Sequence, residues 1–366
     1  MDLIRLSLCG DVMPGRGVDQ ILPHPGNPSL HEHFLRDARS YVVAAEARNG
    51  PITCPVGFAW PWGDALRALA AAAPDVRVIN LESSITRCDD FAPHKGVHYR
   101  MSPDNVRCLS AGRPDVCNLA NNHVLDFGRQ GLADTLHALS LAGLRWVGAG
   151  HDDAEARRPV VLGTSHGRVV VFGYGAASSG IPAGWAATSR RSGVNFLPDL
   201  SDRRAAEITG EIRERTRPGD VVIVSLHWGT NWQYHVGADQ VRFAHQLIDG
   251  GVHVVHGHSS HHPRPIEIYH DRLVLYGCGD FIDDYEGIPG YEQYRDDLRL
   301  LFFASLATSG ELVDLRMLPM QARQMRLHPA SPSDAEWLRA TLARVSACFG
   351  TAVSLSDGAL LARPRA

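Results

Sequence analysis

The feature that most constrains the fold is an alternation, along the chain, of short apolar runs with helical patterns. Each run is four to six residues long and is mostly apolar or β-branched, as expected of a strand buried on both faces. We place candidate strands at Leu3–Leu8, Val76–Leu81, Val116–Leu119, Val169–Phe172, Val221–Leu226 and Val252–Val255. Because strands that alternate with helices build layered sheets, the pattern predicts an α/β fold.

Helical patterns fill several of the intervals between these strands. Asp64–Ala73 is rich in alanine, a second helix carries a stripe of leucines and ends at Gly143, and a third ends at Gly250. Other segments predict β-hairpins, which would make the sheet mixed. These hairpins lie at Pro159–Gly173, Pro265–Tyr276 and Leu301–Leu318.

The chain shows neither an internal repeat nor a low-complexity linker. Its 366 residues are enough for one large domain or two ordinary ones. We expect a single domain over residues 1–330, followed at 331–366 by a surface helix near 334–347 and a frayed tail beyond Gly358.

Charge and residue usage exclude several classes of function. A net charge of −4 gives no electrostatic case for a nucleic-acid partner. Lys95 is the only lysine, and its surroundings do not form a phosphate-binding loop. The seven cysteines include no CxxC pair, so reduced thiols are expected. The N-terminus lacks the pattern of a signal peptide, and no apolar stretch reaches about 18 residues, so we expect no membrane span and a cytoplasmic location.

Polar residues with metal-ligating chemistry follow the predicted strands. They are Asp11, Glu82, Asn122, His227 and His258. Ligands bind at the carboxyl edge of the strands in open α/β sheets, so these side chains should gather at one edge. Taken singly, an aspartate after a strand can be a helix cap, and Asn121-Asn122 can be a turn.

The segment His256–His262 carries four imidazoles in seven residues. Charged imidazoles would repel one another, and a metal ion gives them a reason to be neutral and convergent. A structural or pH-sensing cluster is the alternative. Carboxylate, amide and imidazole ligands suit one or two ions of Zn, Mn or Fe, and Glu82 could bridge two ions.

Taken together and in order, these motifs resemble the CapA family of poly-γ-glutamate capsule-synthesis proteins, within the calcineurin-like metallophosphoesterase superfamily. The motifs are Gly10–Met13, Asn80–Glu82, Asn121–His123 with Asp126–Gly128, His227–Gly229, Gly257–His261 and Gly279–Phe281. The resemblance covers about residues 4–285. It implies a metallophosphoesterase-like sandwich of two mixed β-sheets flanked by helices, with the metal site at one sheet edge.

The resemblance also implies roles for individual residues. Asp11 and His261 would ligate one metal, Glu82 would bridge, and the second metal would take the remaining ligands, Asn122, His227 and His258. His123 matches the general acid, and Asp126 would orient it. From their positions, His256 at the end of a strand and His262 directly after His261, we expect these two histidines not to be ligands, with a role in supporting the ligands as the alternative. The chain differs from the family pattern at Met13, which stands where a histidine is usual, at Glu82 in place of aspartate, and at Asn231 and Asp280.

Two functions are compatible with this sequence. The first is a metal-dependent hydrolase acting on a phosphoester or on an amide of the γ-glutamyl type, with a small-molecule or peptide-like substrate. The second is a non-catalytic accessory or binding protein of capsule synthesis. For the hydrolase, Arg16, Arg100 and Trp228 are candidate substrate-binding residues, each with a structural role as the alternative. The sequence leaves the oligomeric state open.

Overall fold

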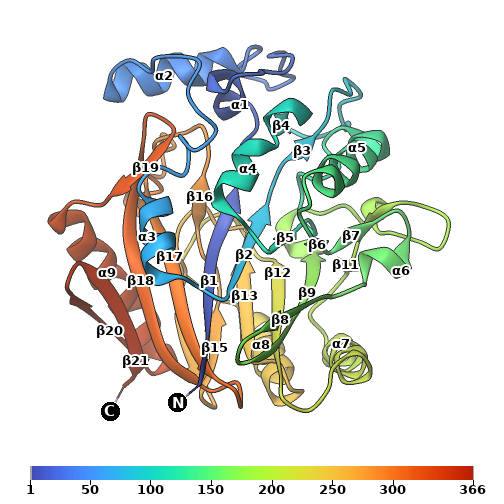
Figure 1. Cartoon of the computed structure of the whole chain (residues 1–366), viewed down its shortest axis with the longest axis vertical. Helices are drawn as coiled ribbons and strands as arrows, with labels where there is room; N and C mark the ends of the chain where they lie inside the picture. The colour runs from blue at the N-terminus through green and yellow to red at the C-terminus, as the bar shows by residue number, and fades with distance from the viewer. Residues whose placement is uncertain (1, 366) are drawn as a thin grey trace.

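A computed structural model of the chain describes residues 2–365 and contains two large β-sheets (Figure 1). In order, the first sheet comprises β20 (Thr351–Ser356), β21 (Ala359–Pro364), β18 (Leu312–Arg323), β17 (Leu298–Ala307), β1 (Leu3–Val12), β2 (Val76–Leu81), β5 (Val116–Asn118) and β6 (Trp146–Val147), with β16 (Asp280–Ile282) beside β1 and β19 (Arg326–Pro329) beside β18. The second comprises β11 (Phe196–Leu197), β9 (Gly167–Ala176), β12 (Asp220–His227), β13 (Val254–His258), β15 (Arg272–Leu275) and β14 (Ile266–Tyr269), with β8 (Val160–Thr164) beside β9. Two-stranded pairs form between β3 (Ser84–Ile85) and β4 (Arg100–Met101), and between β7 (Ala149–Gly150) and β10 (Gly193–Val194).

Both large sheets are mixed. β1 pairs in parallel with β2 but antiparallel with β17, and β9 pairs in parallel with β12 but antiparallel with β8. The predicted sandwich of two mixed sheets is therefore confirmed.

Helices cover the outer faces of the sandwich and its ends. They are α1 (Gly17–Ile21), α2 (Arg39–Asn49), α3 (Ala65–Ala72), α4 (Arg107–Gly112), α5 (Gly128–Leu141), α6 (Asp153–Ala156), α7 (Asp202–Arg215), α8 (Ala238–Asp249) and α9 (Pro332–Ser346). In Figure 1, α1 and α2 lie at the top, above β16, and α9 lies beside β20 and β21. No helix within residues 2–365 is long and apolar enough to cross a bilayer.

The period of two along β12 shows how the layers are built. Val221 and Ile223 belong to the core between the sheets, whereas Val222 and Val224 belong to the core beneath α7 and α8. Successive side chains of a strand point to opposite faces, so a strand with helices on one side and a sheet on the other is apolar throughout.

The stripe that faces the other sheet becomes polar toward the carboxyl end of each central strand. On β12 it continues through Ser225 to His227, and on β13 it runs from Val254 through His256 to His258. On β2 it continues from Val78 to Asn80. The same period of two that packs the core therefore brings polar side chains together between the sheets at one end.

β1 also directs a polar side chain into the space between the sheets, but it does so through an irregularity in its pairing with β2. Leu6 and Leu8 belong to the core between the sheets, but Asp11 is an odd number of residues further on. The pairing with β2 shifts register between Leu8 and Asp11. An extra residue of this kind reverses which face the following side chains occupy, and it turns Asp11 toward the second sheet.

Each predicted strand, helix and hairpin named above has a counterpart within a few residues, and all seven cysteines are free thiols. The prediction of a frayed tail beyond Gly358 is wrong. Residues 351–364 form the hairpin β20–β21, and β21 pairs with β18 and buries Leu360 completely. The turn is Asp357-Gly358, both at positive φ, which is a strong hairpin signal between alternating residues.

Candidate metal centre

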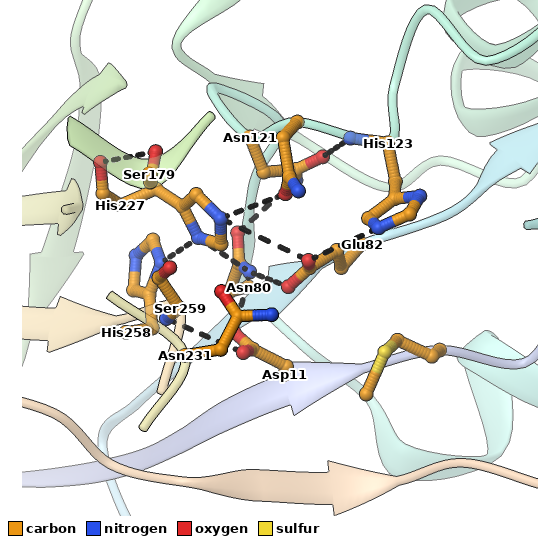
Figure 2. A network of polar contacts seen from close by, with 12 residues as sticks. Asp11, Asn80, Glu82, Asn121, His123, Ser179, His227, Asn231, His258 and Ser259 are labelled. Carbon is orange, nitrogen blue, oxygen red and sulfur yellow. Dashed lines mark hydrogen bonds and ion pairs between the residues drawn. The ribbon is translucent and has the colours of Figure 1, made fainter. Parts of the chain in front are cut away.

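Asp11, His227 and His258 converge between the two sheets (Figure 2). One ligand atom from each lies within 4.8 Å of the others, and all three side chains are buried. His227 and His258 are register partners on β12 and β13, and their Nδ1 atoms are 2.8 Å apart. Three buried ligand groups from two sheets thus face a common point.

The surroundings of His258 fix the orientation of its ring. Its Nε2 lies 3.0 Å from the Ser225 hydroxyl, which also lies 3.1 Å from Nδ1 of His256. If Nε2 of His258 carries the proton and donates it to Ser225, Nδ1 is unprotonated and its lone pair points at the centre. Hydrogen bonds of this kind commonly orient metal-ligating histidines.

The Asn80 side chain lies at the middle of the network. Its amide nitrogen donates to Asp11 Oδ1 at 2.7 Å and to Glu82 Oε2 at 3.0 Å. Its oxygen accepts from the side-chain amides of Asn118 and Asn121, at 3.0 and 3.2 Å. Asn80 therefore holds two carboxylates and is itself held by the amide of Asn118, at the end of β5, and by that of Asn121 in the following loop.

Glu82 and Asn122 border the same space. The Asn122 Oδ1 atom is 3.0 Å from Nε2 of His227, and Oε1 of Glu82 is 3.8 Å from that nitrogen. The structure therefore brings together five of the six predicted metal ligands.

The sixth, His261, has other contacts. Its Nδ1 is 3.0 Å from Asp280 Oδ2, and its Nε2 is 3.0 Å from the Asn231 amide nitrogen. The Tyr285 hydroxyl donates to Asp280 at 3.0 Å. Asp280 is the register partner of Asp11 on β16, so this second group lies beside the first. Asn231 reaches toward the centre in Figure 2.

Burial controls the charge of the centre. It raises the pKa of Asp11 to about 7, with Asp280 contributing, and raises the pKa of Glu82 well above its usual value. It also lowers the pKa values of His227 and His258 well below the ordinary value, so both rings are neutral. Crowded carboxylates with neutral imidazoles favour a bound cation, which supplies the missing positive charge. The donor set therefore fits a transition-metal ion.

His123 forms a pair with Asp126 at the edge of the centre. Its Nδ1 lies 2.6 Å from Asp126 Oδ2, and its Nε2 lies 3.8 Å from Glu82 Oε1. The backbone amide of Tyr99 also donates to Asp126 Oδ2, at 2.7 Å. Burial lowers the pKa of His123 to about 4, against the opposing effect of Asp126. The ring thus binds the carboxylate with one nitrogen and faces the centre with the other.

The predicted substrate-binding residues have structural partners. Trp228 is 1% exposed and donates to the Tyr276 carbonyl, so its position in the core argues against our expectation that it contacts a substrate. Arg16 is ion-paired with Glu32 and Asp284. Arg100 is ion-paired with Asp89 and is also buried. Both guanidinium groups are committed to holding loops together.

The two other imidazoles of the histidine-rich segment, those of His256 and His262, are not among the converging ligand groups, although His256 contacts Ser225 beside His258. His256 bonds through Nε2 to the Cys9 carbonyl at 2.8 Å, and His262 stacks on Tyr294. Sequence reasoning did not single out Asn80, Asn118, Asp280 or Lys95 as site residues. Asn80 had a signal, because it lies two residues before Glu82 and therefore on the same face of its strand.

Comparison with known proteins gives consistent similarities. Residues 5–285 match the family model described as bacterial capsule synthesis protein PGA_cap. The chain is 53% identical to a probable polyglutamine synthesis accessory protein of Mycobacterium tuberculosis, over 96% of this chain and 93% of the relative. It is 24% identical to the PGA biosynthesis protein CapA of Bacillus subtilis, over 81% and 66%. A solved structure of a 5′-nucleotidase precursor from Thermus thermophilus matches with a TM-score of 0.47 and 14% identity, over 94% of this chain and 59% of that chain.

Proposed function

This chain belongs to the bacterial capsule synthesis protein (PGA_cap) family, and we propose that it is a metal-dependent hydrolase. Its substrate would carry a phosphoester or an amide of the γ-glutamyl type. One observation carries the proposal: the buried ligand atoms of Asp11, His227 and His258 converge within 4.8 Å. The His123–Asp126 pair beside them adds a group that can move a proton.

The residues that would hold a metal ion are Asp11, Glu82, Asn122, His227 and His258. If two ions bind, Asp11 and His261 would serve one and Asn122, His227 and His258 the other, with Glu82 shared between them and Asp280 as a further carboxylate. Ligands of these types suit Zn, Mn or Fe. When bound, the ion supplies Lewis-acid chemistry that polarises the scissile bond and makes water a stronger nucleophile.

His123 would move the proton that hydrolysis requires. Asp126 fixes the ring because Nδ1 donates its proton in a hydrogen bond to the carboxylate, which leaves Nε2 facing Glu82. Because the pKa of His123 is lowered to about 4, Nε2 carries no proton at neutral pH, so it would first take up a proton from water in the centre and then give that proton to the leaving group. Asp126 is held in turn by the Tyr99 amide, so the ring is oriented before substrate binds.

The metal assignment is tested by ion content and turnover on the same preparations. The wild-type protein should carry roughly one to two transition-metal ions per chain, as two-metal hydrolytic sites would. It should hydrolyse bis(p-nitrophenyl) phosphate or γ-glutamyl p-nitroanilide, and chelation should abolish the activity. His227→Ala and His258→Ala should lose metal, whereas His270→Ala, which alters an exposed histidine, should keep it. Full occupancy in both site variants contradicts the assignment.

The role of His123 has its own test. His123→Ala should lower turnover by about 10²–10⁴-fold while metal content stays near wild type. Asp126→Asn should have a smaller effect of the same kind, because it disturbs orientation more than proton transfer. Unchanged turnover with a lower melting temperature would remove His123 from the mechanism.

A second candidate function is that of a non-catalytic accessory protein. It is favoured by the printed name of the mycobacterial relative, a probable polyglutamine synthesis accessory protein. A protein that binds metal and a glutamyl polymer but hydrolyses neither chromogenic substrate would support this second function over the first.

A further inference from the structure

Lys95 is the only lysine in a chain that otherwise uses arginine for its basic side chains. The structure places its ammonium group against the His123–Asp126 pair. Nζ donates to Asp126 Oδ1 and to the backbone carbonyl of Asn122, and it lies 3.2 Å from Nδ1 of His123. The side chain is 18% exposed, and the ring of Trp185 lies 5.3 Å from Nζ.

The two oxygens of the Asp126 carboxylate accept hydrogen bonds from three groups. Oδ2 accepts from the His123 ring and from the Tyr99 amide, and Oδ1 accepts from Lys95. Because the proton on Nδ1 is directed at Asp126, the approach of Lys95 to that nitrogen is an electrostatic contact rather than a hydrogen bond. Lys95 thereby holds the carboxylate in the orientation that presents Oδ2 to the ring.

The contact between Lys95 and the Asn122 carbonyl links the ammonium group to a candidate metal ligand. The Asn122 carbonyl that Lys95 binds belongs to the residue whose side-chain oxygen lies 3.0 Å from Nε2 of His227. One ammonium group therefore touches both ends of the segment 122–126, which carries a candidate metal ligand, the ring of His123 and the carboxylate that orients it.

We propose that Lys95 is a positioning residue that clamps the Asn122–Asp126 segment, so that His123 and Asn122 keep a fixed geometry relative to each other. The clamp itself is a property of the fold, and its catalytic consequence rests on the proposed hydrolase function. A compact ammonium with three rotatable donors suits acceptors in different directions, whereas the guanidinium of arginine is a planar fork.

The loop that carries Lys95 does not need the ammonium group to stay in place. The backbone amide of Ala92 donates to the Asp126 carbonyl at 2.8 Å, and the amide of Tyr99 donates to the Asp126 carboxylate at 2.7 Å. Both ends of the loop are therefore tied to Asp126 by hydrogen bonds that main-chain amides donate and that do not involve the ammonium group of Lys95. We expect Lys95→Met to fold.

The sole lysine permits a direct spectroscopic test on the full chain. Lysine labelled with an isotope at Nζ gives one side-chain signal, which is observable by NMR only when hydrogen bonds protect the ammonium from exchange. We expect this signal in the wild-type protein, its loss in Asp126→Asn, and its retention in Asp104→Asn, which alters an exposed carboxylate elsewhere. A wild-type ammonium that exchanges freely, or a signal unaffected by Asp126→Asn, would overturn the clamp.

Kinetics test the consequence for catalysis. Lys95→Met should lower kcat about 10–100-fold, as loss of outer partners does at metal sites, with KM, metal content at saturating metal and melting temperature near wild type. Lys95→Arg should not restore kcat. Arg87→Met, a neutralisation at an exposed site, should leave all four quantities unchanged.

Amine rescue separates hydrogen bonding from charge alone. Added propylamine should restore part of the kcat of Lys95→Ala, and tetramethylammonium, which has no N–H group, should not. Wild-type kcat in Lys95→Met would refute the positioning role and leave the hydrolase proposal standing. If the wild-type protein hydrolyses neither substrate, the hydrolase proposal fails, and the NMR signal still decides whether the clamp exists.

Discussion

Asn80 is the residue whose replacement should reveal how strongly the centre is held together without a metal. It is completely buried, and its amide contacts two carboxylates and two neighbouring amides. Above pH 7, where Asp11 is ionised, Asn80→Ala loses a hydrogen bond to a charged group, which costs about 1.5–3 kcal/mol. The Asn118 amide loses its 3.0 Å partner, at a cost of about 1–3 kcal/mol, whereas Asn121 keeps its 2.8 Å bond to the Leu81 carbonyl.

Water entering the space left by the amide offsets part of this cost. We therefore expect Asn80→Ala to lose about 3 kcal/mol of unfolding free energy in the metal-free protein. Saturation with metal should reduce this loss, because the bound cation then stabilises the two carboxylates that Asn80 contacts. Urea unfolding followed by tryptophan fluorescence, with and without chelator, measures both values.

The control is Asn27→Ala, which removes an exposed amide that bonds Asp89 at 3.3 Å. It should change the free energy of unfolding by less than about 0.5 kcal/mol. A loss below that same limit in metal-free Asn80→Ala would refute the network as a source of stability. An equal loss with and without metal would refute the link between Asn80 and the charge of the centre.

Further predictions concern the rest of the molecule. Burial lowers the pKa of His253 from 6.5 to about 4, so between these pH values the unfolded chain binds a proton that the folded chain does not. The contribution of His253 to stability is complete above pH 6.5 and is lost as the pH falls toward 4, so His253→Gln should make the stability profile less steep there, while other buried histidines such as His123 keep part of the slope. Leu360→Ala should cost about 2–5 kcal/mol in urea unfolding, and a cost near zero would mean that the C-terminal strand is frayed after all. Arg16→Met leaves Glu32 and Asp284 buried without their cation, so it should cost about 3–5 kcal/mol, whereas a stable variant with weaker substrate binding would restore Arg16 as a substrate contact.

The sequence was enough to place the strands and the edge where the chemistry lies. Side-chain direction along a strand alternates because of local covalent geometry, so the run from Val221 to His227 indicates both a buried strand and a polar end. The same reasoning reaches Asn80 and Glu82. The Asp357-Gly358 turn carried an equally local signal, and the tail was mispredicted because that signal was passed over.

Tertiary structure alone decided which distant residues meet. The irregularity between Leu8 and Asp11 turns the aspartate toward the second sheet, and nothing in the composition of β1 reveals it. Asp280 reaches Asp11 only because β16 returns to pair with β1. Lys95 contacts Asp126 because main-chain amides of its loop, those of Ala92 and Tyr99, donate hydrogen bonds to Asp126, about thirty residues further along the chain. A strand's period is set by its own backbone, whereas such pairings depend on the packing of the whole chain, which is why local patterns could not supply them.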